Sequence, residues 1–331
     1  MSNTPSTTFR NELKAKIRHY VEGDYKMTIP LAIPSYKNRK TCILRTPEAL
    51  PDTDVYVFVY DDDFVNSGYD KLAVPSNVKF VKIYESWRGL APKRQFIQRY
   101  MEKFTDRFFM VDDDMRPTGR ITEYDENSTK MARNIPLADV FKVWERYHLE
   151  NNLQCSTSAE SVVAGHVLDT GKLRAENSMS YGSFLVDCKL MRERGVEFNP
   201  CIKYTEDSIY SVDCYKAGIN ITKVMFICID FNQNINYSIE ATIDKWEMKN
   251  IETYLACGGL LKFKYSDKRP YRNLATAKCF TGDPLWGYFS KVLPTVEKPY
   301  QFVEEYFKKQ LAGNPMKASA QEELMFDIDS L

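Results

Sequence analysis

Two short apolar runs in this chain each end in three consecutive aspartates. Asp54–Tyr60 runs directly into Asp61–Asp63, and Arg107–Val111 runs into Asp112–Asp114. Short runs of β-branched and aromatic residues predict strands that are buried on both faces. Three carboxylates at the end of such a strand repel one another unless a cation neutralises them, and Mg²⁺ and Mn²⁺ prefer carboxylate oxygens. The pattern therefore predicts a sheet with a metal and diphosphate site at one edge, unless the acids form a solvated turn.

Strand-like and helix-like segments alternate from about residue 27 to residue 230. The expected strands are 28–33, 54–60, 78–84, 107–111, 161–168, 180–186 and 219–230. The expected helices are 39–50 (interrupted near Pro47), 92–104, 137–148, 188–194 and 205–217, and residues 115–160 are otherwise polar and mixed. Such alternation favours an α/β fold with a Rossmann-like, doubly wound, mostly parallel sheet that binds ligands at the carboxyl ends of its strands. Both aspartate triplets fall at such ends.

Changes in composition divide the chain into four parts. We expect an N-terminal helical arm at 1–26, a large α/β domain at 27–235, a helical and loop-rich extension at 236–311, and a flexible tail at 312–331. A chain of 331 residues is long enough to bury a sizeable core.

Overall charge and cysteine usage narrow the functional classes. The formal net charge is zero, so a nucleic-acid partner would need a local basic patch. The eight cysteines lack zinc-type spacing, and several lie in apolar runs, where a reduced cysteine behaves as a small hydrophobe. The N-terminus has no signal pattern and no apolar stretch reaches membrane-spanning length. We therefore expect a soluble cytoplasmic protein without a membrane partner.

Four stretches, taken in order, carry a resemblance to a known family. They are Ile33–Arg39, the acids after Tyr60, Arg88–Arg94, and Glu206-Asp207 preceded by Phe198–Pro200. In order and spacing they resemble the nucleotide-sugar-dependent glycosyltransferases of the GT-A fold, especially the large family-2-like group. The resemblance covers roughly residues 27–230, and it makes 27–235 the expected catalytic domain.

The resemblance implies a UDP-sugar donor, a Mn²⁺ or Mg²⁺ cofactor and a set of donor-binding residues. That set is Pro34, Ser35, Tyr36, Arg39, Asp61, Asp63, Arg88, Gly89, Lys93, Arg94, Asp112 and Asp113. Asp114 is the expected metal ligand, with Asp112 as a second ligand or a ribose contact. Lys93 and Arg94 open a helix whose N-terminus favours phosphate, although both fit a solvated helix face as well. The ring of Tyr36 is available to stack on the base or to pack at the strand end.

Glycosyl transfer needs a base that removes the proton of the acceptor hydroxyl, and a carboxylate is the usual choice. By resemblance Asp207 is the expected base, with Glu206 next; the alternative is a pair of acids that caps a helix. With Asp207 as base, the reaction inverts the anomeric centre. Many GT-A enzymes add a histidine ligand from their C-terminal part, but no histidine follows His166 here. His166 is thus the remaining candidate for a third ligand, and it also fits a core histidine.

Two features toward the C-terminus bear on the acceptor. Residues 261–280 carry six basic residues and one acid, with interleaved aromatics, which suits a DNA backbone as well as a solvated surface strand. The candidate DNA contacts are Lys262, Lys264, Lys268, Arg269, Tyr271 and Arg272. The acidic tail exposes apolar residues over Leu324–Leu331, similar to the peptides by which bacteriophage proteins bind a sliding clamp, or it packs as a terminal helix.

Together these features resemble the bacteriophage DNA-modifying glycosyltransferases found beside hydroxylases of the TET/JBP type. The implied acceptor is the 5-hydroxymethyl group of a modified pyrimidine in double-stranded DNA, such as hydroxymethylcytosine, and the implied sugar is glucose or arabinose. The host cytoplasm is then the expected location. Three alternatives remain open: the same fold acting on a saccharide or envelope acceptor, a nucleotidyltransferase or phosphotransferase, and a non-catalytic nucleotide- or DNA-binding module.

Overall fold

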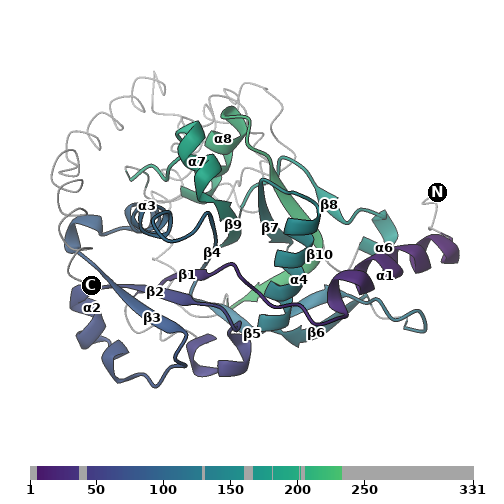
Figure 1. Ribbon diagram of the computed structural model, residues 1–331, viewed down its shortest axis with the longest axis horizontal. Coiled ribbons are helices and arrows are strands. Elements are labelled where there is room, and N and C mark those ends of the chain that lie inside the picture. Colours follow the sequence, from purple (N-terminus) through teal and green to yellow (C-terminus); the bar gives the residue numbers. More distant parts are fainter. Residues whose placement is uncertain are drawn as a thin grey trace, which may run out of the picture.

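The computed structural model describes residues 6–36, 43–128, 131–159, 167–180, 182–200, 202 and 206–232 (Figure 1). Its strands are β1 Leu31–Pro34, β2 Val55–Tyr60, β3 Val78–Ile83, β4 Arg107–Val111, β5 Met115–Thr122, β6 Ala132–Pro136, β7 Cys155–Ala159, β8 Arg174–Ala175, β9 Ser183–Asp187 and β10 Ile221–Phe231. Its helices are α1 Thr7–Val21, α2 Asp61–Asn66, α3 Leu90–Met101, α4 Leu137–Glu150, α6 Val167–Thr170, α7 Cys188–Arg194 and α8 Glu206–Lys216. Short 3-10 turns lie at Ile43–Arg45, Pro47–Ala49, Tyr69–Lys71 and Glu85–Trp87.

The strands of the described residues form one ten-stranded mixed sheet in the order β3-β2-β1-β4-β9-β7-β10-β5-β6, with β8 paired to β10. Strands β3, β2, β1 and β4 are parallel neighbours, and β7 pairs in parallel with β10. Strand β9 runs antiparallel between β4 and β7, and β5 runs antiparallel to β10 and β6. Most strands therefore point one way, and the predicted α/β fold with a doubly wound, mostly parallel sheet is confirmed.

The alternation of side chains along the strands gives the sheet two apolar faces, each covered by helices. Leu31, Val57 and Phe109 belong to one core, whereas Ala32 and Phe108 belong to the other. The first core includes residues of α1 and α4, and the second includes residues of α3, α7 and α8. Figure 1 shows these two groups of helices on opposite sides of the sheet. Successive strand residues face opposite ways, so β2 and β4, which are covered on both faces, are apolar or aromatic over nearly their whole length.

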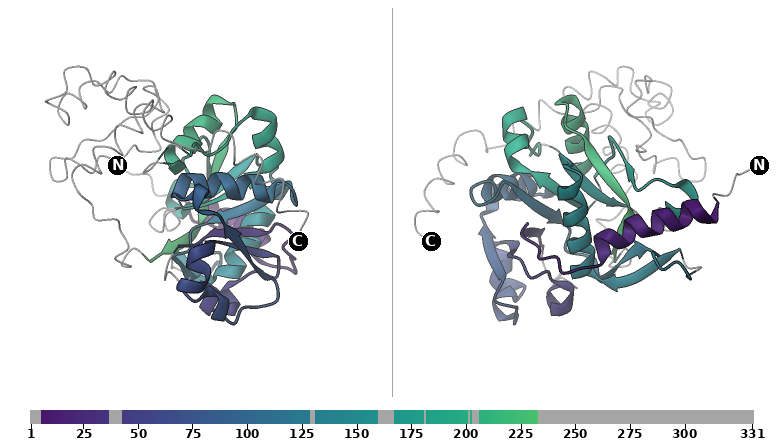
Figure 2. Two further views of the ribbon diagram at one scale, coloured as in Figure 1. Left: turned by 90° about the vertical axis from the view of Figure 1, so that its left-hand side faces the viewer. Right: turned by 45° about the vertical axis from the view of Figure 1, so that its right-hand side comes forward.

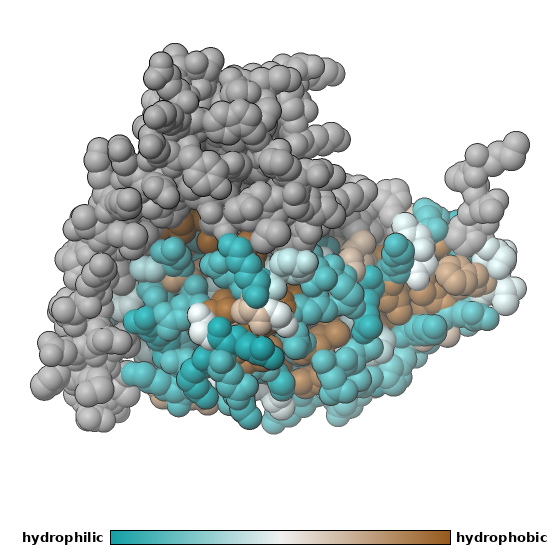
Figure 3. Space-filling model, turned by 90° about the horizontal axis from the view of Figure 1, so that it is seen from above, coloured by the Kyte–Doolittle hydropathy of each residue, from teal (hydrophilic) through white to brown (hydrophobic). Residues whose placement is uncertain are grey.

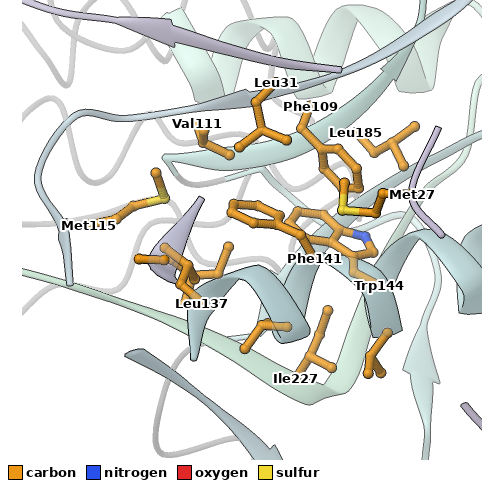
Figure 4. Packing of buried hydrophobic residues seen from close by; sticks show 14 of the residues in the cluster. Met27, Leu31, Phe109, Val111, Met115, Leu137, Phe141, Trp144, Leu185 and Ile227 are labelled. Carbon is orange, nitrogen blue, oxygen red and sulfur yellow. The ribbon is translucent and has the colours of Figure 1, made fainter. Parts of the chain in front are cut away.

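Large aromatic side chains fill the core beneath α4 (Figure 4). Phe109 from β4 packs against Phe141 and Trp144 from α4, with ring centroids 5.3 and 4.9 Å apart. The indole Nε1 of Trp144 donates to Ser156 Oγ at 2.7 Å, so this buried polar group is satisfied. The close packing of α4 on β4 fixes the position of the strand that ends in Asp112.

The N-terminal helix α1 lies beside α4 and α6 at one side of the molecule, as the right-hand view of Figure 2 shows. Lys14 is buried and donates to the carbonyl oxygens of Asp125 and Ser128, each at 2.9 Å. A helix lies at Thr7–Val21 within the expected 1–26 segment, and it contacts the connection between β5 and β6.

Local sequence patterns predicted several elements closely and missed others. β4 and α7 have the predicted bounds, and the helix predicted at 137–148 is α4, but no strand was predicted within 115–160, where β5, β6 and β7 lie. Residues 167–170 form α6, where the sequence predicted the end of a strand, and residues 160–166 lie outside the described part. The 39–50 helix is replaced by two 3-10 turns in its described portion.

The surface seen from above carries mostly hydrophilic residues where it is described, with apolar residues showing in smaller patches (Figure 3). No helix within the described ranges combines the length and apolar character needed to cross a membrane. The extension at 236–311 and the tail at 312–331 lie outside the described residues.

Candidate functional site

The candidate site lies where β1 and β4 sit side by side and the order of the parallel strands reverses. The chain passes outward from β1 to β2 and β3, and then returns to place β4 on the other side of β1. Ligands of open α/β sheets bind at this switch point, beyond the carboxyl ends of the strands. The register pairs Ala32 with Met110, so its continuation sets Ser35 beside Asp113. The segment after β1 and the second aspartate triplet therefore meet here.

Arg94, on the first turns of α3, joins three motifs that are far apart in the sequence. Its Nη2 lies 2.6 Å from Asp112 Oδ1, and its Nη1 lies 3.5 Å from Glu206 Oε1. The side chain is only 2% exposed. The guanidinium carbon lies 5.8 and 5.9 Å from the ring centroids of Phe184 and Phe198, which enclose it. The alternative of a solvated helix face is thus wrong for Arg94.

Burial and charge compete within this cluster. Burial lowers the pKa of Arg94, but the nearby carboxylates of Asp112, Glu206 and Asp207 raise it by more. The net effect is a raised pKa, so the guanidinium stays charged. Burial raises the pKa of Glu206 to about 7, against the lowering effect of Arg94. Nε and Nη1 of Arg94 have no hydrogen-bond partner among the described residues. The site therefore holds the positive charge of Arg94 between the carboxylate of Asp112, which follows β4, and the carboxyl group of Glu206, which begins α8.

Glu206 and Asp207 form the first turn of α8, as the acid pair predicted. Asp207 Oδ1 accepts a hydrogen bond from Ser208 N at 2.7 Å, so one of its oxygens bonds the helix backbone. The Asp207 carbonyl accepts from Ser211 Oγ at 2.7 Å, and Ser211 Oγ accepts from Ser180 N at 3.0 Å. This chain of bonds ties the helix start to the segment that leads into β9. Asp207 is partly exposed, whereas Glu206 is buried.

Asp112 and Asp114 frame the end of β4. Asp112 N donates to Gly182 O at 2.8 Å, and Gly182 adopts a φ of +63°. A Cβ at Gly182 would lie 3.1 Å from Asp112 Oδ2, so glycine leaves room for this carboxylate. The Asp114 carbonyl accepts from Asn232 N at 2.7 Å, just beyond β10.

The donor set at the end of β4 fits a Mg²⁺ or Mn²⁺ ion that also binds a phosphate-bearing substrate. Such an ion uses one or two carboxylates together with phosphate and water oxygens, rather than a cage of protein ligands. The second oxygen of Asp112 and the carboxylate of Asp114 supply that number. No cluster of three or more His, Cys, Asp or Glu suited to a metal occurs within the described residues. His166, the remaining candidate ligand, lies outside them.

Lys93 and Asp113 are both buried, which the sequence did not predict. Lys93 Nζ donates to the Ser35 carbonyl and lies 3.9 Å from the centroid of the Tyr60 ring. Asp113 Oδ2 accepts from Ser35 Oγ at 2.8 Å and from Tyr36 N at 3.3 Å. The expected solvated alternative is therefore wrong for Lys93 also. Both charged groups hold the segment that follows β1.

The acids after β2 form the start of α2 rather than a loop. Asp61 pairs with Lys82 at 3.0 Å, and Asp62 pairs with Arg88 at 2.7 Å, while Asp63 is buried. Acids favour a helix N-terminus because its backbone N–H groups carry partial positive charge. Arg88 also lies 4.6 Å above the Tyr60 ring. Arg88, a predicted donor-binding residue, thus contacts both Asp62 and the ring of Tyr60.

Tyr60 was missed as a site residue, although it ends β2. Its hydroxyl accepts from Gly89 N at 2.8 Å, and Gly89 has a φ of +124°. A buried tyrosine needs a partner for its hydroxyl, so a tyrosine at the last position of a strand was the available signal. Arg39 and the six predicted DNA contacts lie outside the described residues, as does the tail. Pro34 ends β1.

Comparisons with known proteins found similar structures at low identity. No family profile matches the chain, and no curated protein matches it. The S. aureus TarS 1–349 structure in complex with UDP-GlcNAc has 12% identity and a TM-score of 0.46, covering 70% of this chain and 66% of its own. A second TarS 1–349 structure has 14% identity and a TM-score of 0.41, covering 61% and 59%. A mycobacterial protein has 13% identity and a TM-score of 0.39, covering 86% and 92%.

The chain spans less than two thirds of the length of these TarS structures. Since all three TM-scores lie below 0.5, the similarities carry no argument about activity. A functional conclusion must therefore rest on the residues of the site.

Proposed function

We propose that this protein is a metal-dependent glycosyltransferase that moves a sugar from a UDP-sugar to a hydroxyl acceptor. One observation carries the proposal: buried Arg94 contacts both Asp112 and Glu206 at the carboxyl ends of the parallel strands. The donor-side and acceptor-side motifs of the family that the sequence resembles thereby meet at one point. Burial of a guanidinium between two carboxyl groups costs desolvation free energy. Its position at this edge of the sheet therefore supports a functional role.

In the proposed reaction the donor diphosphate lies at the end of β4, near the first turn of α3. Asp112 and Asp114 would hold a Mg²⁺ or Mn²⁺ ion, which supplies positive charge to the departing diphosphate. Arg94 orients Asp112 through the 2.6 Å contact. Asp207 takes the proton of the acceptor hydroxyl as that oxygen attacks the anomeric carbon, and UDP leaves with the bonding electrons. Attack from the side opposite to UDP inverts the anomeric centre.

The proposed acceptor is the 5-hydroxymethyl group of a pyrimidine in double-stranded DNA, as in phage DNA that contains hydroxymethylcytosine. A group on C5 points into the major groove, so it is accessible without extrusion of the base. The support is the basic, aromatic segment at 261–280 in a chain of zero net charge. Clamp binding through Leu324–Leu331 is a further proposal, based on the apolar residues of the tail.

A direct test incubates the full chain with hydroxymethylated DNA, unmodified DNA and a panel of UDP-sugars, with Mg²⁺, with Mn²⁺ or with EDTA. Nucleoside mass spectrometry should detect a hexose or pentose adduct only with hydroxymethylated DNA and metal. UDP release without an adduct would indicate hydrolysis of the donor and would overturn the DNA acceptor in favour of another one, such as a saccharide. UDP-sugar binding without UDP release or adduct on any acceptor would indicate a binding module and overturn the proposal.

Asp207→Asn tests the proposed base. The amide keeps the side-chain volume and an oxygen for the Ser208 N–H, but it takes no proton. We expect the transfer rate to fall by roughly 10²- to 10⁴-fold while the Kd for UDP-sugar stays within about twofold. Asp213→Asn, on the same helix α8, is the matched control and should retain activity. Near-normal turnover by Asp207→Asn would remove Asp207 from the mechanism and leave its helix-capping role.

A further inference from the structure

The three aspartates after β4 differ in their surroundings. Asp113 is 3% exposed, whereas Asp112 and Asp114 on either side are partly exposed. The three residues connect β4 to β5, and Asp113 and Asp114 lie in a turn, where the side chain of Asp113 is directed into the protein. A buried carboxylate needs hydrogen-bond partners, because unpaired burial of a charge is costly.

Ser35, just beyond β1, is the main partner of Asp113. Ser35 Oγ donates to Asp113 Oδ2 at 2.8 Å, and the Tyr69 hydroxyl lies 2.6 Å from Ser35 Oγ. Since Ser35 gives its proton to the carboxylate, Tyr69 donates to Ser35. The backbone of Ser35 is bonded too: its N–H donates to Phe58 O at 2.9 Å, and its carbonyl accepts from Lys93 Nζ. Every polar group of Ser35 therefore has a partner.

The next residue, Tyr36, is held by the same carboxylate but presents its ring to solvent. Tyr36 N donates to Asp113 Oδ2 at 3.3 Å, and the side chain is 38% exposed. Its ring stands nearly perpendicular to that of Tyr60, with centroids 6.1 Å apart, and Lys93 Nζ lies 5.7 Å from its centroid. Because these contacts already restrict the backbone and ring of Tyr36, stacking of a ligand on the ring costs little further conformational entropy.

We propose that Asp113 and Ser35 are a positioning pair that holds Tyr36 in place for the nucleotide part of the donor. Neither residue contacts the donor; both act through the conformation of the segment after β1. The proposal rests on the proposed function. It separates the roles within the triplet, since Asp112 and Asp114 face the diphosphate and Asp113 fixes the neighbouring strand end. Lys93 also holds the segment after β1, because its Nζ donates to the Ser35 carbonyl.

The test measures UDP binding by calorimetry and donor KM and kcat by UDP release, for the full chain with Mg²⁺. Ser35→Ala and Asp113→Ala each remove one end of the 2.8 Å bond. We expect a rise of roughly tenfold in the Kd for UDP and in the donor KM, with kcat within about threefold, as fits the loss of one charge-assisted bond. The double variant should be little worse than either single variant, because the two residues act as one unit.

Asp113→Asn distinguishes positioning from direct contact. An amide oxygen in place of Oδ2 accepts from both Ser35 Oγ and Tyr36 N, so this variant should recover most of the affinity lost in Asp113→Ala. If the charge of Asp113 touched the donor or its metal, Asn would be as impaired as Ala, and the proposal would be wrong. Asp54→Asn, an exposed carboxylate paired with Lys79, is the matched control.

Two outcomes separate this proposal from the proposed function. Wild-type protein that binds no UDP and releases none from any UDP-sugar overturns both. Wild-type protein that binds UDP, with folded Ser35→Ala and Asp113→Ala variants that bind it equally well, overturns the positioning pair alone. The circular dichroism spectrum and the unfolding midpoint identify folded variants. Should Asp113→Ala fail to fold, Ser35→Ala carries the test, because it leaves the carboxylate and the Tyr36 N–H bond in place.

Discussion

At the scale of single residues, charge balance around Arg94 decides what the site can do. The guanidinium is buried between Asp112 and Glu206, and its nitrogens Nε and Nη1 have no hydrogen-bond partner in the described part of the chain. A lysine would supply one ammonium in place of a planar group that spans both carboxyl groups. The arrangement therefore requires arginine. Burial and the charge of Arg94 act in opposite directions on the pKa of Glu206.

Glu206 makes stability depend on pH near neutrality. Burial raises its pKa from 4.5 to about 7, so the folded protein binds a proton that the unfolded chain releases. This contribution to stability is complete below pH 4.5 and is lost as the pH rises through about 7. We expect the urea midpoint of the wild type to decrease between pH 5 and pH 8, and Glu206→Gln to reduce that decrease. Glu12→Gln, at an exposed position on α1, should keep the wild-type profile; an unchanged profile in Glu206→Gln would contradict the prediction.

At the scale of elements, α3 and α4 hold the site from opposite faces of the sheet. Beyond Arg94, helix α3 presents Gln95, Gln98 and Arg99 to the segment before α8. Gln98 Nε2 donates to Val196 O at 2.8 Å, and Arg99 Nη2 lies 2.6 Å from Glu197 Oε2. One helix thus fixes Asp112 and the approach to α8 together. Its spacing of polar residues three and four apart places them on one face.

Glu145 of α4 holds the segment before β1 on the other face of the sheet. Its fully buried carboxylate accepts from Thr28 N at 2.8 Å, Ile29 N at 3.1 Å and Tyr25 OH at 3.0 Å, just before β1. Glu145→Gln turns one acceptor oxygen into a donor that faces other donors. We expect a loss of about 1 to 3 kcal/mol in the free energy of unfolding, measured in urea.

Glu150→Gln is the matched control for Glu145→Gln, because Glu150 lies on the same helix and forms exposed pairs with Arg146 and His19. Exposed pairs contribute little, so this change should cost less than about 1 kcal/mol. Equal losses in the two variants would show that the buried bonds before β1 do not matter to stability.

At the scale of the whole molecule, strand order brings the motifs together. β1 and β4 are separated by more than seventy residues of sequence but lie side by side, with α3 between them in the chain. β10 ends at Phe231, whose ring would lie 3.0 Å from a Cβ at Gly182, beside Asp112. The chain therefore continues toward 236–311 from a point next to the candidate site.

The predicted DNA contacts are tested on the whole protein. Replacement of Lys268, Arg269 and Arg272 by Ala should weaken binding to double-stranded DNA and reduce the slope of log K against log salt by about 2 to 3, because fewer counterions are released. UDP-sugar hydrolysis without DNA should stay unchanged. Replacement of Lys16, Lys26 and Arg45 by Ala is the matched control for removal of three charges. Equal salt slopes for the wild type and the 268–272 variant would exclude this segment as the DNA contact.

The sequence by itself determined the apolar strands β2 and β4 and the acids that follow them, but not β7, which is buried throughout and consists of Cys, Ser, Thr and Ala. The bounds of β4 and α7 could be predicted because continuous apolar runs and helix signals are local. Strands β5 and β6 were not predictable in this way: β5 mixes exposed and buried residues, and β6 lies at the sheet edge with no buried residue. Pairing with a neighbour, rather than local pattern, makes them strands.

Tertiary structure alone decided what each charged residue does. The sequence distinguished Asp114 and Asp112 as expected ligands from Asp113 only by resemblance, and Lys93 and Arg94 appeared as two cations at a helix start. In the fold Asp113 and Lys93 are buried against Ser35, and Arg94 is buried against Asp112 and Glu206. The physical reason is that a charge can be buried only where another segment supplies its hydrogen-bond partner. Those partners come from strands and helices distant in sequence, so only the folded chain assigns the roles.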